Sequence, residues 1–301
     1  MKVGIILSLR DSTTGPAPRY GEIRALVRQA EASGIDSFWL FDHLLVRAPG
    51  QPDYGFWEAW TMLSALAEAT SRIEAGTLVA CASFRNPAVL AKMAEALDEV
   101  SLGRLVLGLG AGWLQSDFEP FGLPHDGLVG RLEEALEIIC PFLRTGTADF
   151  AGRFWRATAC VNLPRGPRPS GLPVLVGGHG PRLLRLAARF ADAWNTCWFA
   201  RPDDEWQRQR GALERACREE GRDPASLALT VGVPVVHADL GATLPAGDER
   251  GRVVAGDAAE VVSALRAFDA VGVAHVMCSL KPTTPVAVER LAKALQVYRA
   301  G

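Results

Sequence analysis

The chain has 301 residues, and its 32 basic and 34 acidic side chains give a formal net charge of −2. A hydrophobic share of 49% provides enough apolar material for a buried core and excludes a disordered chain. The balanced charge, without a basic run, argues against a nucleic acid or a membrane surface as partner. No apolar stretch approaches the roughly 18 residues that cross a bilayer. The N-terminus lacks a signal-peptide pattern and the six cysteines form no C-x-x-C pair, so we expect a cytoplasmic protein with reduced cysteines.

Apolar strand patterns alternate with amphipathic helix patterns along the whole chain. The expected strands are Val3–Leu9, Ser37–Phe41, Ile73–Ala82, Arg104–Leu109, Pro173–Val176, Ala193–Cys197, Leu227–Val236 and Val273–Leu280. The expected helices are Glu22–Ala32, Trp57–Ala69, Pro87–Val100, Arg131–Leu143, Pro181–Phe190, Asp204–Glu220, Ala258–Phe268 and Pro285–Tyr298. Strands that are apolar throughout are typical of a parallel sheet covered by helices. Eight such units predict one (β/α)8 TIM barrel over residues 1–301; the alternative, a doubly wound open sheet, normally stops at about five or six strands.

Three stretches are longer than ordinary loops and predict insertions, at about 113–130 after the fourth strand, 145–172 before the fifth strand, and 239–252. Within the second stretch, Asp149–Arg156 and Ala159–Leu163 are typical of a small β excursion. The third is polar and rich in glycine. We interpret it as a lid that orders over a bound ligand.

The carboxyl ends of the barrel strands are where an active site is expected. Asp42 and His43 follow the second strand, and a histidine with a pKa near 6.5 suits proton transfer there. The alternative is structural, with Asp42 capping the loop and His43 bonded to a loop carbonyl. No H-x-H follows the first strand and no H-E-x-x-H occurs, so no metal site is expected.

Two glycine-rich stretches lie at the same edge. The run from Gly108 to Gly112 permits close approach of a ligand to the backbone, although a tight exit turn explains it equally. The stretch from Gly177 to Gly180 leads into a helix that begins at Pro181, the arrangement of an anion site, to which Arg182 could add charge. A turn without a ligand is again the alternative. Cys81, near the end of the third strand, is typical of a small core residue.

Several motifs occur together and in a fixed order. They are Phe41-Asp42-His43-Leu44, Ser83-Phe84-Arg85-Asn86-Pro87 with Leu90-Ala91-Lys92-Met93-Ala94, Ser101-Leu102-Gly103-Arg104-Leu105 with Gly108-Leu109-Gly110-Ala111-Gly112-Trp113, Phe121-Gly122-Leu123-Pro124, and Gly177-Gly178-His179-Gly180-Pro181 with the segment from Leu186 to Asn195. In this combination the chain resembles the luciferase-like family of flavin- and deazaflavin-dependent oxidoreductases, over almost its whole length. The resemblance implies a (β/α)8 barrel with a cofactor at its mouth.

The resemblance also implies roles for individual residues. Coenzyme F420, a deazaflavin, would exchange hydride with a small organic substrate, with Asp42 meeting the deazaflavin head and His43 as the catalytic proton carrier. A bulge with a non-prolyl cis peptide is expected near Leu78-Val79-Ala80. The residues implied in cofactor binding are Asp42, Leu78, Val79, Cys81, Ala111, Gly112, Ser116, Gly177, Gly178, His179 and Gly180.

One departure bears on the substrate. Related dehydrogenases of sugar phosphates carry a glutamate directly after the glycine run, where this chain has Trp113. We therefore expect a less polar substrate. The alternatives are an FMN-dependent monooxygenase that uses reduced flavin and O2, a non-catalytic flavin-binding protein, and a metal-dependent barrel hydrolase. The resemblance allows a homodimer and implies a flavin or deazaflavin reductase as the source of reduced cofactor.

Overall fold

The computed structural model describes residues 1–10, 16–47, 49–50 and 52–301, and its centre is a closed parallel barrel. Its strands are β1 (Lys2–Leu7), β2 (Ser37–Leu40), β5 (Glu74–Thr77), β7 (Leu105–Gly110), β10 (Val174–Gly177), β11 (Ala193–Cys197), β12 (Ala228–Val236) and β14 (His275–Lys281). Each pairs in parallel with its neighbours, and the ring closes because β14 pairs with β1 and β10 pairs with β7. The predicted (β/α)8 TIM barrel is confirmed.

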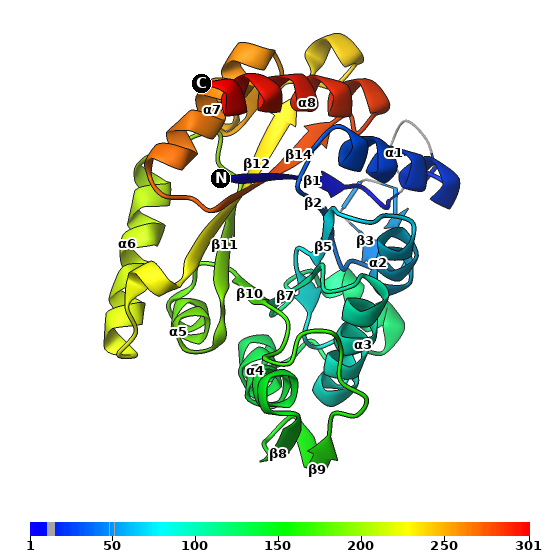
Figure 1. Cartoon of the computed structure of the whole chain (residues 1–301), viewed down its shortest axis with the longest axis vertical. Helices are drawn as coiled ribbons and strands as arrows, with labels where there is room; N and C mark the ends of the chain where they lie inside the picture. The colour runs from blue at the N-terminus through cyan, green and yellow to red at the C-terminus, as the bar shows by residue number, and fades with distance from the viewer. Residues whose placement is uncertain (11–15, 48, 51) are drawn as a thin grey trace.

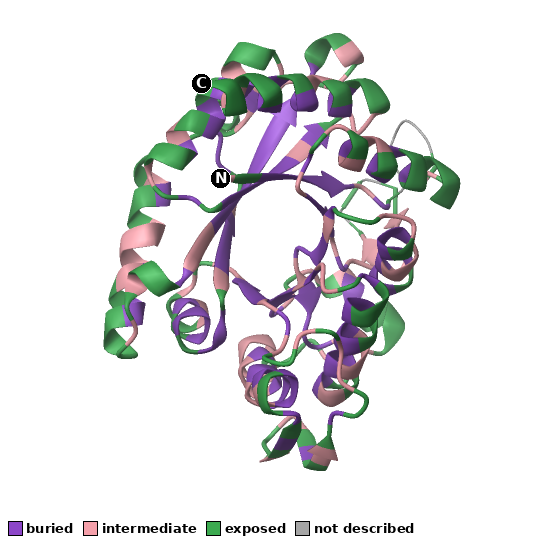
Figure 2. Cartoon of the chain, viewed as in Figure 1, coloured by how far each residue is buried: buried purple, intermediate pink, exposed green. Residues whose placement is uncertain are grey.

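The helices surround this ring (Figure 1). They are α1 (Tyr20–Ala32), α2 (Ala59–Glu68), α3 (Pro87–Val100), α4 (Leu128–Thr145), α5 (Pro181–Phe190), α6 (Asp204–Glu219), α7 (Ala258–Ala270) and α8 (Pro285–Ala300). Their apolar faces are buried against the strands and their outer faces are exposed (Figure 2). Several begin at the caps that the sequence offers; the side chain of Asn86, for example, accepts hydrogen bonds from the first turn of α3.

Helix α2 begins two residues later than predicted. The carboxylate of Glu58 accepts a hydrogen bond of 2.7 Å from the backbone of Thr61, which makes Glu58 the N-cap. Trp57 therefore lies outside the helix, where its indole donates to the carbonyl of Pro18.

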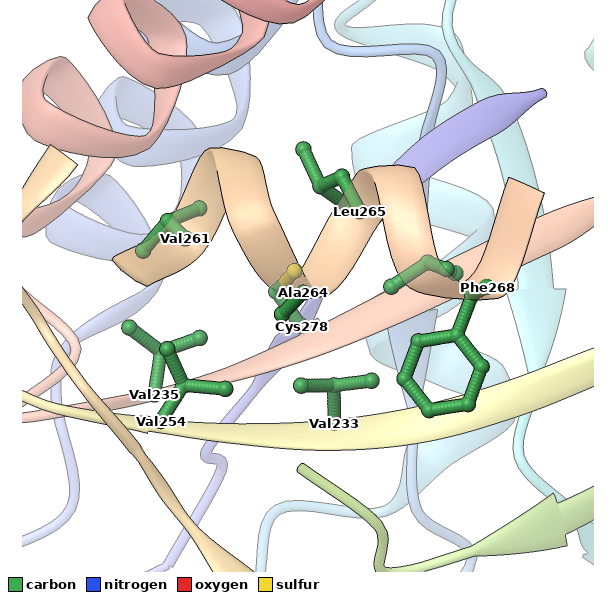
Figure 3. Close-up of a pocket in the computed structure, with 9 residues that line it drawn as sticks. Val233, Val235, Val254, Val261, Ala264, Leu265, Phe268 and Cys278 are labelled. Carbon is green, nitrogen blue, oxygen red and sulfur yellow. The ribbon is translucent and has the colours of Figure 1, made fainter. Parts of the chain in front are cut away.

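The interior has two apolar layers. The larger lies between the strands and the helices, and a smaller cluster inside the ring is formed by Ile6, Trp39, Leu78, Leu175 and Met277. Under α7 the outer layer leaves a cavity of about 10 Å³, lined only by apolar side chains of α7 and the strands beneath it (Figure 3). An apolar cavity of this size holds no ordered water, so it is a packing gap and not a binding site.

The third barrel strand differs from the continuous strand predicted at Ile73–Ala82. It is divided into β5 and the short β6 (Ala80–Cys81), both paired with β7, and the peptide bond between Leu78 and Val79 in the interruption is cis. This is the place where the resemblance puts such a bond. An antiparallel pair, β3 (Leu45–Val46) and β4 (Tyr54–Gly55), was not predicted.

The three insertions carry short elements. The first holds the 3₁₀ turns η1 (Gln115–Asp117) and η2 (Glu119–Phe121). The second holds the antiparallel pair β8 (Thr147–Ala151) and β9 (Arg156–Val161), which projects from the barrel (Figure 1) and confirms the β excursion with shifted ends. The third contains η5 (Gly247–Arg252); η4 (Ala238–Leu240) lies at its start, β13 (Val254–Ala255) follows its end, and η3 (Pro224–Ser226) precedes β12. No helix in the described ranges is both long and apolar enough to cross a bilayer.

Candidate active site

His43 lies just beyond the carboxyl end of β2 and is bound by a carboxylate from the first insertion. Its Nδ1 is 2.6 Å from Oδ2 of Asp117 in η1. The other oxygen of Asp117 accepts hydrogen bonds from the backbone amides of Leu44 (2.7 Å) and Leu45 (3.0 Å). The side chain of Asp117 is only 3% exposed, whereas that of His43 is 23% exposed. The insertion after β7 thus orients the histidine that follows β2.

Aromatic rings surround the imidazole of His43. The ring centroids of Phe41, Phe56 and Trp113 lie 6.2, 5.5 and 6.1 Å from that of His43, and Trp198 meets Phe41 edge-on at 6.0 Å. We call Phe41, Phe56, Trp113 and Trp198 the aromatic group. Trp113 is 73% exposed, so an apolar ring surface faces solvent beside the histidine.

Asp42 has different surroundings from its neighbour. Both of its carboxylate oxygens bind the guanidinium of Arg85, at 2.6 and 3.1 Å, and one also accepts from the backbone of Cys81 at 3.0 Å. Burial raises the pKa of Asp42, and the charge of Arg85 opposes that rise. The side chain of Asp42 is fully buried, so its carboxylate is closed off from solvent. Direct contact of this carboxylate with a cofactor head stays a prediction, and this enclosure disfavours it.

Arg85 joins three elements, because it also binds the carboxylate of Glu58 at 2.5 Å. Glu58 caps α2, Asp42 follows β2, and Cys81 ends β6. The network therefore holds the ends of the second and third barrel strands at the mouth.

The glycines at the ends of β7 and β10 make room for Val79. A Cβ on Gly110 would lie 2.4 Å from a methyl carbon of Val79, and Cβ atoms on Gly108 and Gly177 would lie 3.3 and 3.0 Å from one. Gly110 therefore leaves room for this side chain, whereas a Cβ on Gly108 would first meet the backbone carbonyl oxygen of Thr77 at 2.0 Å; close packing, and not a tight exit turn, explains both glycines. Leu78 belongs to the inner cluster of the barrel, and Val79 packs against that cluster.

Ala111, Gly112 and Cys81 form one packed unit. The Cys81 thiol points to the carbonyl of Ala111 (3.7 Å), and a Cβ on Gly112, whose φ is +80°, would lie 2.7 Å from this sulfur. Burial raises the pKa of Cys81 to about 12, so it remains a thiol at neutral pH. This fits the interpretation of Cys81 as a core residue; contact of these residues with a cofactor remains a prediction.

Ser116 lies beside Asp117 and has its own partners. Its hydroxyl donates to the carbonyl of Leu45 (2.8 Å) and accepts from the backbone of Arg47 (3.2 Å). It therefore fastens η1 to β3. Binding of a cofactor by this hydroxyl is untested.

The start of α5 leaves backbone donors available. Gly180 precedes the helix without a side-chain cap, and Pro181 is its first residue. First-turn amides of a helix have no partner within it, and a Cβ on Gly180 would meet nothing within 4 Å. His179 is exposed, and the space beside Gly178 is filled by Leu183. The free space and the free amides fit an anionic group of a ligand.

The sequence suggested that Arg182 adds positive charge to this anion site, but in the structure its guanidinium is already paired with a carboxylate. The guanidinium of Arg182 binds the carboxylate of Glu133 on α4. The charge of Arg182 is thus paired with Glu133, and the donors that the start of α5 itself offers are backbone amides.

Three side chains of the site have no predicted role: Asp117 and Glu58, which no motif includes, and Arg85, which appears only within the motif Ser83-Phe84-Arg85-Asn86-Pro87. Asp117 lies in the first insertion, at the predicted mouth, and it is acidic between a serine and the buried Phe118. Its position in the insertion could have marked Asp117 as a candidate site residue. Its pairing with His43 could not have been predicted, because it depends on the path of the insertion in space. In the described residues no three His, Cys, Asp or Glu side chains lie close enough together to hold a metal ion.

The chain is similar to known proteins both in sequence and in structure. The sequence profile of the luciferase-like monooxygenase family matches residues 1–244. The phthiodiolone/phenolphthiodiolone dimycocerosates ketoreductase of Mycobacterium tuberculosis is 35% identical over 226 residues, which are 68% of this chain and 58% of the relative. The matched region is thus less than two thirds of the length of that relative.

Two solved structures have the same fold. The coenzyme F420-dependent tetrahydromethanopterin reductase of Methanopyrus kandleri superposes with a TM-score of 0.79 at 18% identity and covers 99% of both chains. A monooxygenase of Streptomyces bottropensis gives a TM-score of 0.78 at 19% identity and covers 99% of this chain and 100% of that one. At these identities the likeness concerns the fold. Because the family profile covers well over half of the sequence, this chain belongs to the luciferase-like monooxygenase family.

Proposed function

We propose that this protein is an oxidoreductase that transfers hydride between a deazaflavin, coenzyme F420, and a small organic substrate. The observation that carries the proposal is the pairing of His43 with the buried Asp117 at the mouth, because a partly exposed, oriented histidine suits proton transfer. The similarity to a ketoreductase and to an F420-dependent reductase supports the same chemistry. When bound, the deazaflavin supplies or accepts the hydride.

The residues present fit such a cofactor. The free amides at the start of α5 would bind a phosphate of its tail, with Gly180 leaving space for it. Leu78 and Val79 would form an apolar support at the third-strand interruption. Asp42 and Arg85 would hold the backbone of β2 and β6 in place around the site. His43 would donate or accept the proton that accompanies hydride transfer.

The aromatic group favours a weakly polar ketone or secondary alcohol as substrate. Phe41, Phe56 and Trp113 present apolar ring surface around His43, the histidine that Asp117 orients. A panel of alkyl and aryl ketones beside a sugar phosphate tests this class. Efficient turnover of the sugar phosphate, with none of the ketones, would contradict it.

The first test is equilibrium binding of coenzyme F420 and of FMN side by side, followed by quenching of tryptophan fluorescence. We expect micromolar or tighter binding of F420 and weaker binding of FMN. The opposite preference would support the FMN-dependent monooxygenase. Tight binding of a cofactor with no turnover on any substrate would support a non-catalytic flavin-binding protein. Binding of neither F420 nor FMN would contradict all three of these functions.

A pair of variants at one position tests the phosphate site. Gly180→Asp places a carboxylate in free space beside the free amides, so binding of F420 and of FMN should weaken on the order of tenfold or more. Gly180→Ala is the matched control, because the φ of −67° at Gly180 accepts any side chain. A deazaflavin without phosphate should bind all three proteins equally. If Gly180→Asp weakens binding of the phosphate-free deazaflavin as much as binding of F420, the substitution does not act through a phosphate.

A further inference from the structure

The carboxylate of Asp117 acts as an acceptor at each of its oxygens. Oδ1 accepts two backbone N–H groups, from Leu44 and Leu45, and Oδ2 lies 2.6 Å from Nδ1 of His43. An ionised carboxylate has only acceptor sites. The hydrogen in the contact with His43 therefore belongs to Nδ1, and the imidazole is the donor.

We infer that Asp117 is a positioning residue that keeps the proton of neutral His43 on Nδ1, so that Nε2 is the atom that exchanges a proton with the substrate. The effect on turnover rests on the proposed function; the tautomer does not. Within the described residues no hydrogen bond engages Nε2. Contacts with Phe56 and Trp113 further restrict the imidazole, so the direction of Nε2 is set by packing as well as by Asp117.

The proton step balances in either direction. In the reduction of a ketone, a reduced deazaflavin would be the two-electron donor: one of its C–H bonds would break as the hydride forms the new C–H bond on the carbonyl carbon of the substrate. The Nε2–H bond of protonated His43 breaks and an O–H bond forms on the substrate. His43 is left neutral with its remaining proton on Nδ1, which is the tautomer that Asp117 holds. Oxidation of an alcohol reverses each transfer.

The variant Asp117→Asn tests the inference because an amide has only one acceptor oxygen. The two backbone donors at Leu44 and Leu45 hold that oxygen, so the NH₂ group faces Nδ1 of His43. Nδ1 must then accept, and the proton moves to Nε2. We expect kcat to fall roughly 10- to 100-fold, with KM and cofactor affinity changed less than a few-fold.

The tautomer is measured directly by ¹⁵N NMR of selectively labelled histidine, with the His43 signals assigned from a His43→Gln spectrum. In the wild-type protein at a pH where His43 is neutral, the protonated nitrogen should be Nδ1. In Asp117→Asn it should be Nε2. A merely structural role of Asp117 would lower the melting temperature without exchanging these signals.

The matched control is Glu119→Gln, the same chemical change two residues away on an exposed side chain of the same insertion. It should leave the tautomer and turnover unchanged. Wild-type His43 with its proton on Nε2, or Asp117→Asn with wild-type kcat, would overturn the inference. The wild-type spectrum decides the first point even if the variant does not fold. Because it needs neither cofactor nor substrate, it separates this inference from a failure of the proposed function.

Discussion

Asp42 and His43 are adjacent, yet they serve different purposes. Asp42 points into the protein, where Arg85 neutralises its carboxylate, whereas His43 points toward the aromatic group and is partly exposed. Asp42 therefore stabilises the framework of the barrel, whereas His43 is available at the mouth.

At this scale we predict that His43→Ala lowers turnover roughly 100-fold or more, with cofactor affinity within a few-fold of wild type. The reason is the loss of the proton carrier with little loss of binding surface. Steady-state kinetics and a binding titration check both parts. His125→Ala is the control, since His125 is exposed on the same insertion. Unchanged turnover in His43→Ala would remove this histidine from the mechanism.

Among the elements, the charge network of Asp42, Arg85 and Glu58 connects β2, β6 and α2. Its central ion pair is almost completely buried, with side-chain exposures of 15% for Arg85 and 0% for Asp42. Removing one partner from such a pair leaves the other charge uncompensated. The network therefore stabilises the mouth only as long as it is complete.

We predict that Arg85→Met lowers the free energy of unfolding by about 3–5 kcal/mol. Without the guanidinium, the pKa of Asp42, already raised by burial, should rise further. Urea titrations measure the loss. Arg47→Met is the control: it breaks the exposed pair with Asp53, and the free energy of unfolding should change far less than in Arg85→Met. The double variant Arg85→Met with Asp42→Asn should be more stable than Arg85→Met alone. If its loss of free energy of unfolding equals the sum of the two single losses, Asp42 and Arg85 do not stabilise each other.

In the molecule as a whole, the site and a second polar network lie at opposite ends of the barrel. At the amino end of the strands, His275 of β14 is 2.7 Å from the hydroxyl of Ser37 in β2, which also accepts from the indole of Trp39. The hydroxyl of Ser37 has one proton, which it can donate to the bonded nitrogen of the imidazole. A Cβ on Gly4, in β1 between them, would lie 2.0 Å from this hydroxyl, so the network needs a glycine there. It joins the strands on either side of β1.

This network makes folding stability depend on pH. Burial lowers the pKa of His275 to about 3, whereas an unfolded histidine titrates near 6.5. Between these values the unfolded chain binds the extra proton, so stability rises with pH. The contribution of His275 is complete above about pH 6.5 and is lost toward pH 3, by roughly 1.4 kcal/mol per pH unit and about 5 kcal/mol in all.

The measurement is urea unfolding of the wild type and of His275→Gln from pH 4 to pH 8. Glutamine does not titrate, so the two pH profiles should differ by the uptake of one proton on unfolding below about pH 6. Parallel profiles would show that His275 is not held neutral.

Much of the fold was accessible from local patterns. Apolar runs and amphipathic periodicity are local consequences of burial on one or both faces, so they predicted the barrel, and caps such as Asn86 marked helix ends. The division of the third strand followed from the family resemblance and not from periodicity. The pair β3 and β4 was missed because strands of two residues are too short to show alternation.

The sequence by itself determined the strand order, the position of the mouth and the presence of His43 there, because each depends on neighbours along the chain. Only the tertiary structure decided the partners of the charged groups. Asp117 is 74 residues from His43, and Arg85 is 43 residues from Asp42. Such pairings arise where insertions and strand ends meet in space, and no local pattern encodes them. The same holds for Val79, whose packing explains glycines on two other strands.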